Sequence, residues 1–134
     1  MPTKTVLIAD RDLGFVFWIG QRLDRAGYRA FPANSAANAA DIVRQFRLVV
    51  DLLILNPSIR GIREFAKKLR LAQGHLRTII VMDEGDGPVS GLPRTAALLR
   101  KPRLRDEGSE IEWLETIERV LAEDAARSAG SGAR

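Results

Sequence analysis

The residues best placed to do chemistry are polar side chains that stand where short apolar runs end. The run 51–56 is rich in Leu and Ile, ends on Asn56 and is broken by Pro57. Such a run is typical of a strand buried on both faces of a parallel sheet. Because sites in open parallel sheets form at the carboxyl ends of the strands, Asn56 is predicted to lie at a functional edge.

Acidic residues are predicted to gather at the same edge. The apolar segment 6–9 stops at an acid, and further acids follow the apolar segment 78–82. Acids arranged in this way can bind calcium or take part in acid–base chemistry, but they are more often a solvated rim. The acids concerned are Asp10, Asp12, Asp83, Glu84 and Asp86.

Strand and helix patterns alternate along the chain and predict the elements that position these residues. Apolar runs predict strands at 6–9, 28–31, 52–56, 78–82 and 96–99. Apolar residues at helical spacing predict helices at 14–26, 36–46, 62–72 and 110–126. This alternation gives right-handed crossovers, so the predicted fold class is α/β, with a five-stranded parallel sheet and helices on both faces.

The segment between the fourth and fifth predicted strands is interrupted by residues that break helices. They are Gly85, Gly87, Pro88, Gly91 and Pro93. Prolines and glycines at this density cannot sustain a regular helix. The fourth crossover helix is therefore expected to be degenerate.

Composition limits the classes of protein to consider. The chain has 134 residues and no cysteine, which predicts one domain without disulfides or thiolate metal sites. We expect this domain to cover residues 1–126, followed by a disordered Gly-, Ser- and Ala-rich tail at 127–134. No apolar stretch approaches the ~20 residues that span a bilayer, and no signal-peptide pattern is present, so we expect a cytoplasmic protein without membrane contact.

The formal net charge of +4 raises the question of a nucleic-acid partner. The arginines, however, are interspersed with acids and recur at helical spacing, which is typical of a solvated surface. We therefore keep a basic nucleic-acid-binding accessory protein only as the alternative function, and nucleic acid is disfavoured as a partner.

The order and spacing of five short motifs resemble the receiver domains of two-component response regulators. The motifs are 6–12, 26–28, 51–55 with Gly61 downstream, 78–82, and Lys101 with Pro102. The likeness covers residues 4–124, nearly the whole chain. It implies a receiver (flavodoxin-like) fold and a role in phosphorelay signal transduction.

The resemblance also implies a phosphoryl-transfer pocket, from which this sequence departs. Receivers phosphorylate an aspartate, hold magnesium with acids, and hold the phosphoryl oxygens with a Ser/Thr and a lysine. Asp10 and Lys101 match this pattern, but Asn56 stands at the phosphoacceptor, Arg11 at the second acid and Asp83 at the Ser/Thr position. An amide is a poor nucleophile, arginine is no magnesium ligand, and a carboxylate repels phosphoryl oxygens. We therefore expect a pseudo-receiver pocket without phosphorylation, metal or cofactor.

Two points about this pocket stay open in the sequence. A shift of one residue would make Asp12 the second acid, although Asn56 and Asp83 would remain. Arg11 either joins Lys101 in making the pocket neutral without metal, or points to solvent.

A candidate interface lies on the helix 14–26, which carries consecutive apolar residues at 15–19. An inward stripe buries about half of such a run and leaves Val16 or Phe17 outward, with Gly20 one turn on. An exposed apolar pair beside a glycine suits docking or self-association. The opposing interpretation is that the whole run is core.

The function expected from these observations is a non-phosphorylated receiver-like signalling module that acts by protein–protein interaction. We expect no enzymatic activity. The expected partner is a signalling protein of unknown identity or a second copy of the chain. The conventional phosphoacceptor role is nearly excluded by Asn56.

Overall fold

The computed structural model describes residues 3–83, 95–102 and 107–132, and within them a five-stranded sheet is flanked by four helices. The strands are β1 (Thr5–Ala9), β2 (Arg29–Ala33), β3 (Leu52–Leu55), β4 (Arg77–Met82) and β5 (Thr95–Arg100). The helices are α1 (Leu13–Arg25), α2 (Ala36–Phe46), α3 (Ile62–Ala72) and α4 (Glu107–Gly132). All neighbouring strands are parallel, in the order β2-β1-β3-β4-β5. The predicted α/β fold class with a parallel sheet is confirmed.

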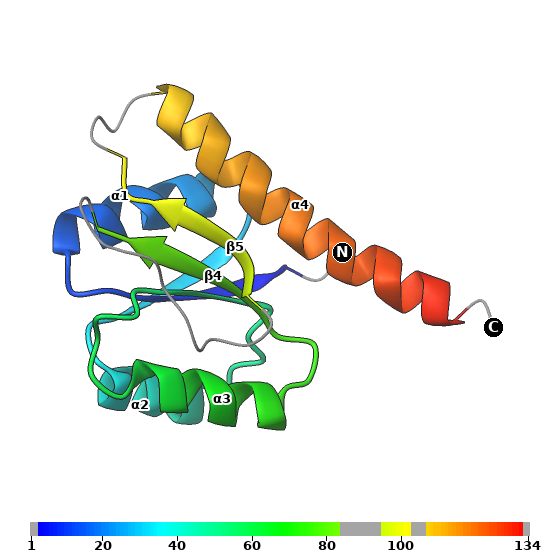
Figure 1. Cartoon of the computed structure of the whole chain (residues 1–134), viewed down its shortest axis with the longest axis horizontal. Coiled ribbons are helices and arrows are strands. Elements are labelled where there is room, and N and C mark those ends of the chain that lie inside the picture. The colour runs from blue at the N-terminus through cyan, green and yellow to red at the C-terminus, as the bar shows by residue number, and fades with distance from the viewer. Residues whose placement is uncertain (1–2, 84–94, 103–106, 133–134) are drawn as a thin grey trace.

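The helices lie on both faces of the sheet, with α2 and α3 on one face and α1 and α4 on the other (Figure 1). Each central strand contributes to both layers, because successive side chains point to opposite faces. In β1, Val6 and Ile8 belong to the core under α1 and α4, whereas Leu7 and Ala9 belong to the core under α2 and α3. Burial on both sides is the physical reason for the continuous apolar runs of β1 and β3.

Local residues fix where the helices begin and end. The Asp12 and Ser35 side chains each accept a hydrogen bond from a first-turn N–H, at 3.2 and 3.0 Å, and so cap α1 and α2. Gly27, which follows the end of α1, has a φ of 92°, a backbone conformation that glycine adopts readily. The predicted helices 36–46 and 62–72 agree with the bounds of α2 and α3.

Some predicted boundaries differ from the structure. The strand predicted to end at residue 31 continues through Pro32, which is tolerated because β2 is an edge strand. The last helix was predicted over 110–126, but α4 begins at Glu107 and ends at Gly132. Residues 127–132, which the sequence assigns to a disordered tail, lie within α4 in the structure.

The predicted degenerate fourth helix falls on residues 84–94, outside the described residues. Within the described part of the chain, no helix is both long and apolar enough to cross a membrane.

Candidate functional site

Polar residues that follow four strands meet at the carboxyl edge of the sheet. Asp10 follows β1, Asn56 follows β3, Asp83 follows β4 and Lys101 follows β5. The backbone N–H groups of Asn56 and Lys101 each donate a hydrogen bond to a carbonyl oxygen of a neighbouring strand, with N–O distances of 2.9 Å. These four residues lie together because parallel strands bring their carboxyl ends to one edge of the sheet.

The Lys101 ammonium group lies among three carboxylates. Its Nζ atom is 3.0 Å from Asp10 Oδ2, 2.6 Å from Asp83 Oδ1 and 3.4 Å from Asp12 Oδ2. The Lys101 side chain is 11% exposed, and its Nζ lies 5.3 Å from the centre of the Phe15 ring. A cation held in this way, largely out of water, interacts with its carboxylates more strongly than a surface ion pair does.

The Asn56 side chain is the neutral donor of the pocket. Its Nδ2 atom donates to Asp10 Oδ2 at 3.3 Å and to Asp83 Oδ2 at 3.1 Å. Its Oδ1 atom accepts a hydrogen bond from the Ser58 backbone N–H at 3.0 Å, and the residue is 2% exposed. An ionised carboxylate at this position would have no hydrogen to donate. The two acids are therefore matched to an amide rather than to the aspartate of a phosphoacceptor.

Asp10 is the buried acid of the pocket, with 3% exposure. Its Oδ1 atom accepts the Asp12 backbone N–H at 2.8 Å, and Lys101 Nζ lies within 3.1 Å of both of its carboxylate oxygens. A buried carboxylate is costly unless it is paired and hydrogen-bonded. Here a backbone N–H, an amide and an ammonium group supply those partners, so the pocket is closed by the chain's own side chains.

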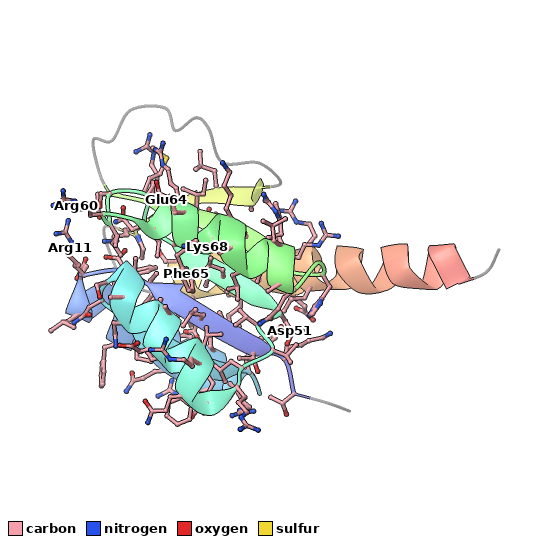
Figure 2. All side chains as sticks on the ribbon, turned by 90° about the horizontal axis from the view of Figure 1, so that it is seen from below. Arg11, Asp51, Arg60, Glu64, Phe65 and Lys68 are labelled. Carbon is pink, nitrogen blue, oxygen red and sulfur yellow. The ribbon has the colours of Figure 1, made fainter. Side chains whose placement is uncertain are left out.

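Of the alternatives that the sequence left open, the structure has Arg11 pointing to solvent and Asp12 facing the pocket. Arg11 is exposed at the outer edge of the molecule, on the same side as Arg60 (Figure 2). Asp12 turns its carboxylate to Lys101 while it also caps α1. The pairing of Asp12 with Lys101 spans 89 positions in the chain. Sequence reasoning missed it, as it missed the Phe15 ring beside the ammonium group, because neither contact leaves a local pattern.

Lys101 and Asp83 shift each other's pKa. The hydrogen bond from Lys101 lowers the pKa of Asp83 below 3.8, against the effect of burial, and the Asn56 amide and the charge of Arg11 act in the same direction as Lys101. Burial alone would lower the pKa of Lys101, but its hydrogen bonds to Asp83 and Asp10 raise that pKa above 10.5. Both shifts keep the pair charged over the neutral range.

We expect the stability contributed by Asp83 to be lost in acid. Because the folded pKa of Asp83 lies below the unfolded value near 3.8, the contribution is present above that pH and disappears as the pH falls through the folded pKa. The contribution that Lys101 makes to stability is present below pH 10.5, and it is lost as the pH rises through the raised pKa of Lys101 in the folded protein. Urea midpoints measured from about pH 6 down to about pH 2 should fall less steeply for Asp83→Asn than for the wild type. Equal acid dependence of the two proteins would contradict the assignment.

The pocket residues do not fit the magnesium ion that the resemblance implies. Lys101 Nζ already lies among the carboxylates, and Arg11 stands where a ligand oxygen would be needed. Among the residues that the structure describes, no group of three or more His, Cys, Asp or Glu side chains is arranged to hold a metal ion. The ammonium group of Lys101 provides the counter-charge instead.

The predicted interface residues of α1 divide into a buried and an exposed part. Phe15 and Ile19 are fully buried, as the inward stripe requires, and Phe17 is 68% exposed. Val16 was a candidate for the outward face, but it is 9% exposed because it packs into the core of this layer. Val16, Phe17 and Gly20 nevertheless line one groove. Whether this surface binds a partner stays a prediction.

Comparisons with known proteins show which proteins this chain is similar to. No protein-family model matches the sequence. The sporulation initiation phosphotransferase F of Bacillus subtilis is 28% identical over 88 residues, which cover 64% of this chain and 69% of that protein. The CheY-like receiver domain protein of Methanospirillum hungatei superposes with a TM-score of 0.70 at 21% identity, over 94% of this chain and 99% of that one. The N-terminal domain of a response regulator/sensory box/GGDEF protein of Carboxydothermus hydrogenoformans gives 0.73 at 17% identity, over 93% and 99%.

The chain therefore has the fold of response-regulator receiver domains over nearly its whole length. Part of the chain is also similar in sequence to the sporulation initiation phosphotransferase. None of these comparisons favours the nucleic-acid alternative.

Proposed function

We propose that this chain is a receiver-like signalling module of the phosphorelay type that acts by protein–protein interaction without being phosphorylated. The observation that carries the proposal is the Asn56 amide, which donates to both Asp10 and Asp83 at the place where a receiver carries its phosphoacceptor. An acyl phosphate forms on a carboxylate, and the amide nitrogen here is already committed to two acids.

The position of Asp83 supports the same proposal. One of its carboxylate oxygens lies 2.6 Å from the Lys101 ammonium group, and the other accepts a hydrogen bond from the Asn56 amide at 3.1 Å. In the resembled family, the matching lysine holds the oxygens of the phosphoryl group. We infer that the Asp83 carboxylate stands in for that group as an internal anion. A phosphoryl group entering the pocket would meet this negative charge and would have to displace it.

A pocket closed by its own residues leaves protein contact as the mode of action. The module would present one state to its partner at all times, because no phosphodonor is needed to complete the Lys101 contacts. Partner binding should accordingly be the same with and without a phosphodonor. No chemical turnover forms part of this proposal.

We expect no phosphorylation when the purified protein is incubated with acetyl phosphate and magnesium. Intact-mass spectrometry should show only the unmodified chain, while a receiver with an intact aspartate, treated in parallel, gains a phosphoryl group. A hydroxylamine-sensitive phosphoryl adduct on this chain, absent from Asn56→Ala, would overturn the proposal. An adduct that maps to Asp10 or Asp83 would also overturn the proposal, because the pocket would then accept a phosphoryl group.

A further inference from the structure

The helices α3 and α4 carry opposite charges and lie on opposite faces of the sheet (Figure 1). Residues 60–72, which comprise α3 and the turn before it, include five basic residues and one acid, Glu64. Residues 107–122 of α4 show the reverse, with five acids and one base, Arg119. Each copy of the chain therefore presents one basic helix and one acidic helix.

The basic residues of α1, which contacts α4, do not cancel the acidic charge of α4. Arg22 is already paired with the partly buried Glu110, with Nε 3.7 Å from Oε2. Arg25 is exposed, but it is accompanied by the exposed Asp24. The acids that α4 exposes are Glu107, Glu112, Glu115 and Glu118. The exposed side of α4 thus stays predominantly negative.

An acid, a base and an apolar side chain follow one another along the outward side of α3. Glu64, Lys68 and Leu71 are all exposed and lie three or four residues apart, so they share one face of the helix. Figure 2 shows Glu64 and Lys68 one after the other along α3. Leu71 is 87% exposed. Within the part of the chain that the structure describes, neither Glu64 nor Lys68 is ion-paired.

The outward side of α4 carries the complementary side chains in the reverse order. Ile111 is 53% exposed, and Glu115 and Arg119 follow it at intervals of four residues and are also exposed. From its C-terminal side, α4 therefore presents a base, an acid and an apolar side chain. The complementarity includes the minority charges, because the one acid of α3, Glu64, is matched by the one base of α4.

We propose that α3 of one copy of this chain packs antiparallel against α4 of a second copy. The facing pairs are then Glu64 with Arg119, Lys68 with Glu115, and Leu71 with Ile111. Opposite charges meet at two positions, and two exposed apolar side chains leave water together. A parallel arrangement of the same helices would not bring both minority charges to opposite charges.

The contact is heterologous, because the two copies use different faces. Since α3 and α4 lie on opposite faces of the sheet, two copies cannot make both contacts with each other. Each added copy leaves one helix of each kind free, so we expect open-ended association rather than a closed dimer. One helix against one helix buries less than the ~1,200 Å² of a stable interface, so the association should be weak and sensitive to salt.

The inference rests on the proposed function for its signalling role, since it names the partner of that module, but its test uses the protein alone without a phosphodonor. Sedimentation equilibrium up to about 1 mM protein should give an average mass that rises with concentration at about 0.1 M salt. At about 1 M salt, where the Debye length falls to ~3 Å, the mass should return towards that of the monomer. A wild type that stays monomeric at the lower salt overturns the inference, even if a nucleic acid or another protein binds α3. Association that 1 M salt leaves unchanged overturns it as well.

Charge reversals test the pairing of the two helices. Lys68→Glu and Glu115→Lys should each weaken the association by about tenfold or more, because like charges then face each other. An equimolar mixture of the two variants should associate again, since one supplies an unaltered α3 and the other an unaltered α4. The matched control is Arg29→Glu on the edge strand β2, which changes the net charge as Lys68→Glu does and should leave the association unchanged. A mixture that stays monomeric, or an equal loss in the control, overturns the inference.

Glu64→Lys tests the antiparallel register. This variant makes α3 more basic, so a general attraction between basic and acidic surfaces would become stronger. The proposed register places residue 64 against Arg119, so Glu64→Lys should instead weaken the association, and adding Arg119→Glu should restore it. Association that Glu64→Lys strengthens or leaves unchanged overturns the inference. None of these results bears on phosphorylation, so the proposed function is judged separately.

Discussion

Replacing Lys101 with methionine should destabilise the protein by about 3–5 kcal/mol, the cost of leaving a buried charge without its partner. Methionine keeps most of the side-chain volume but removes the ammonium group that Asp10, Asp12 and Asp83 share. Asp83 and Asp12 have side chains that are 44% and 41% exposed, so water can replace the lost cation there. Asp10 is 3% exposed, so water cannot replace the lost cation there. The change in the free energy of unfolding, from urea denaturation at neutral pH, measures the effect.

The double variant Lys101→Met, Asp10→Asn identifies the acid that is responsible. It removes the buried charge together with its partner, so it should recover more than half of the loss. Lys101→Met with Asp83→Asn should recover less, because Asp83 is partly solvated. A single Lys101→Met variant as stable as the wild type would show that the ion pairs contribute little and that the pocket is not held by them.

Changing Asn56 to aspartate should destabilise the protein and should not create a working phosphoacceptor. The variant removes the two hydrogen bonds that Nδ2 donates to Asp10 and Asp83, and it places another carboxylate against them. Leaving buried acceptors without a donor costs about 1–3 kcal/mol, and the added repulsion acts in the same direction. Arg11 and Asp83 still oppose magnesium and phosphate, so acetyl phosphate should not modify residue 56 to the level of an ordinary receiver.

Asn56→Ala and Asn56→Asp together separate the two causes of destabilisation. The alanine variant loses the hydrogen bonds without gaining a charge, so it should be the more stable of the two at neutral pH. The difference between their free energies of unfolding should become smaller on acidification, because the new carboxyl group of Asn56→Asp becomes protonated. An Asn56→Asp variant that is as stable as the wild type and is fully phosphorylated would show that the rest of the pocket supports phosphoryl transfer.

The sequence determined the elements and most of their bounds. Strands β1 and β3 could be predicted from the sequence, because a strand buried on both faces requires a continuous run of apolar residues. Such a run consists of adjacent residues, so it can be recognised without the structure. The helix ends followed from residues that act within one turn, such as the Asp12 and Ser35 caps and the glycine after α1. The identities at the carboxyl edge, above all Asn56, were also readable, because the strand that precedes each of them fixes its place.

Tertiary structure decided how those residues meet. The contacts of Asn56 with Asp10 span 46 positions, and those of Lys101 with Asp10 span 91. No local period encodes such pairs, so whether Arg11 joins Lys101 in the pocket or points to solvent depended on the arrangement of the loops in space. The same holds on α1, where neighbouring apolar residues separate into a buried Val16 and an exposed Phe17. A helical pattern gives the spacing of a buried face, but the rotation of the helix on the sheet, set by packing against other elements, decides which residue at its margin is covered.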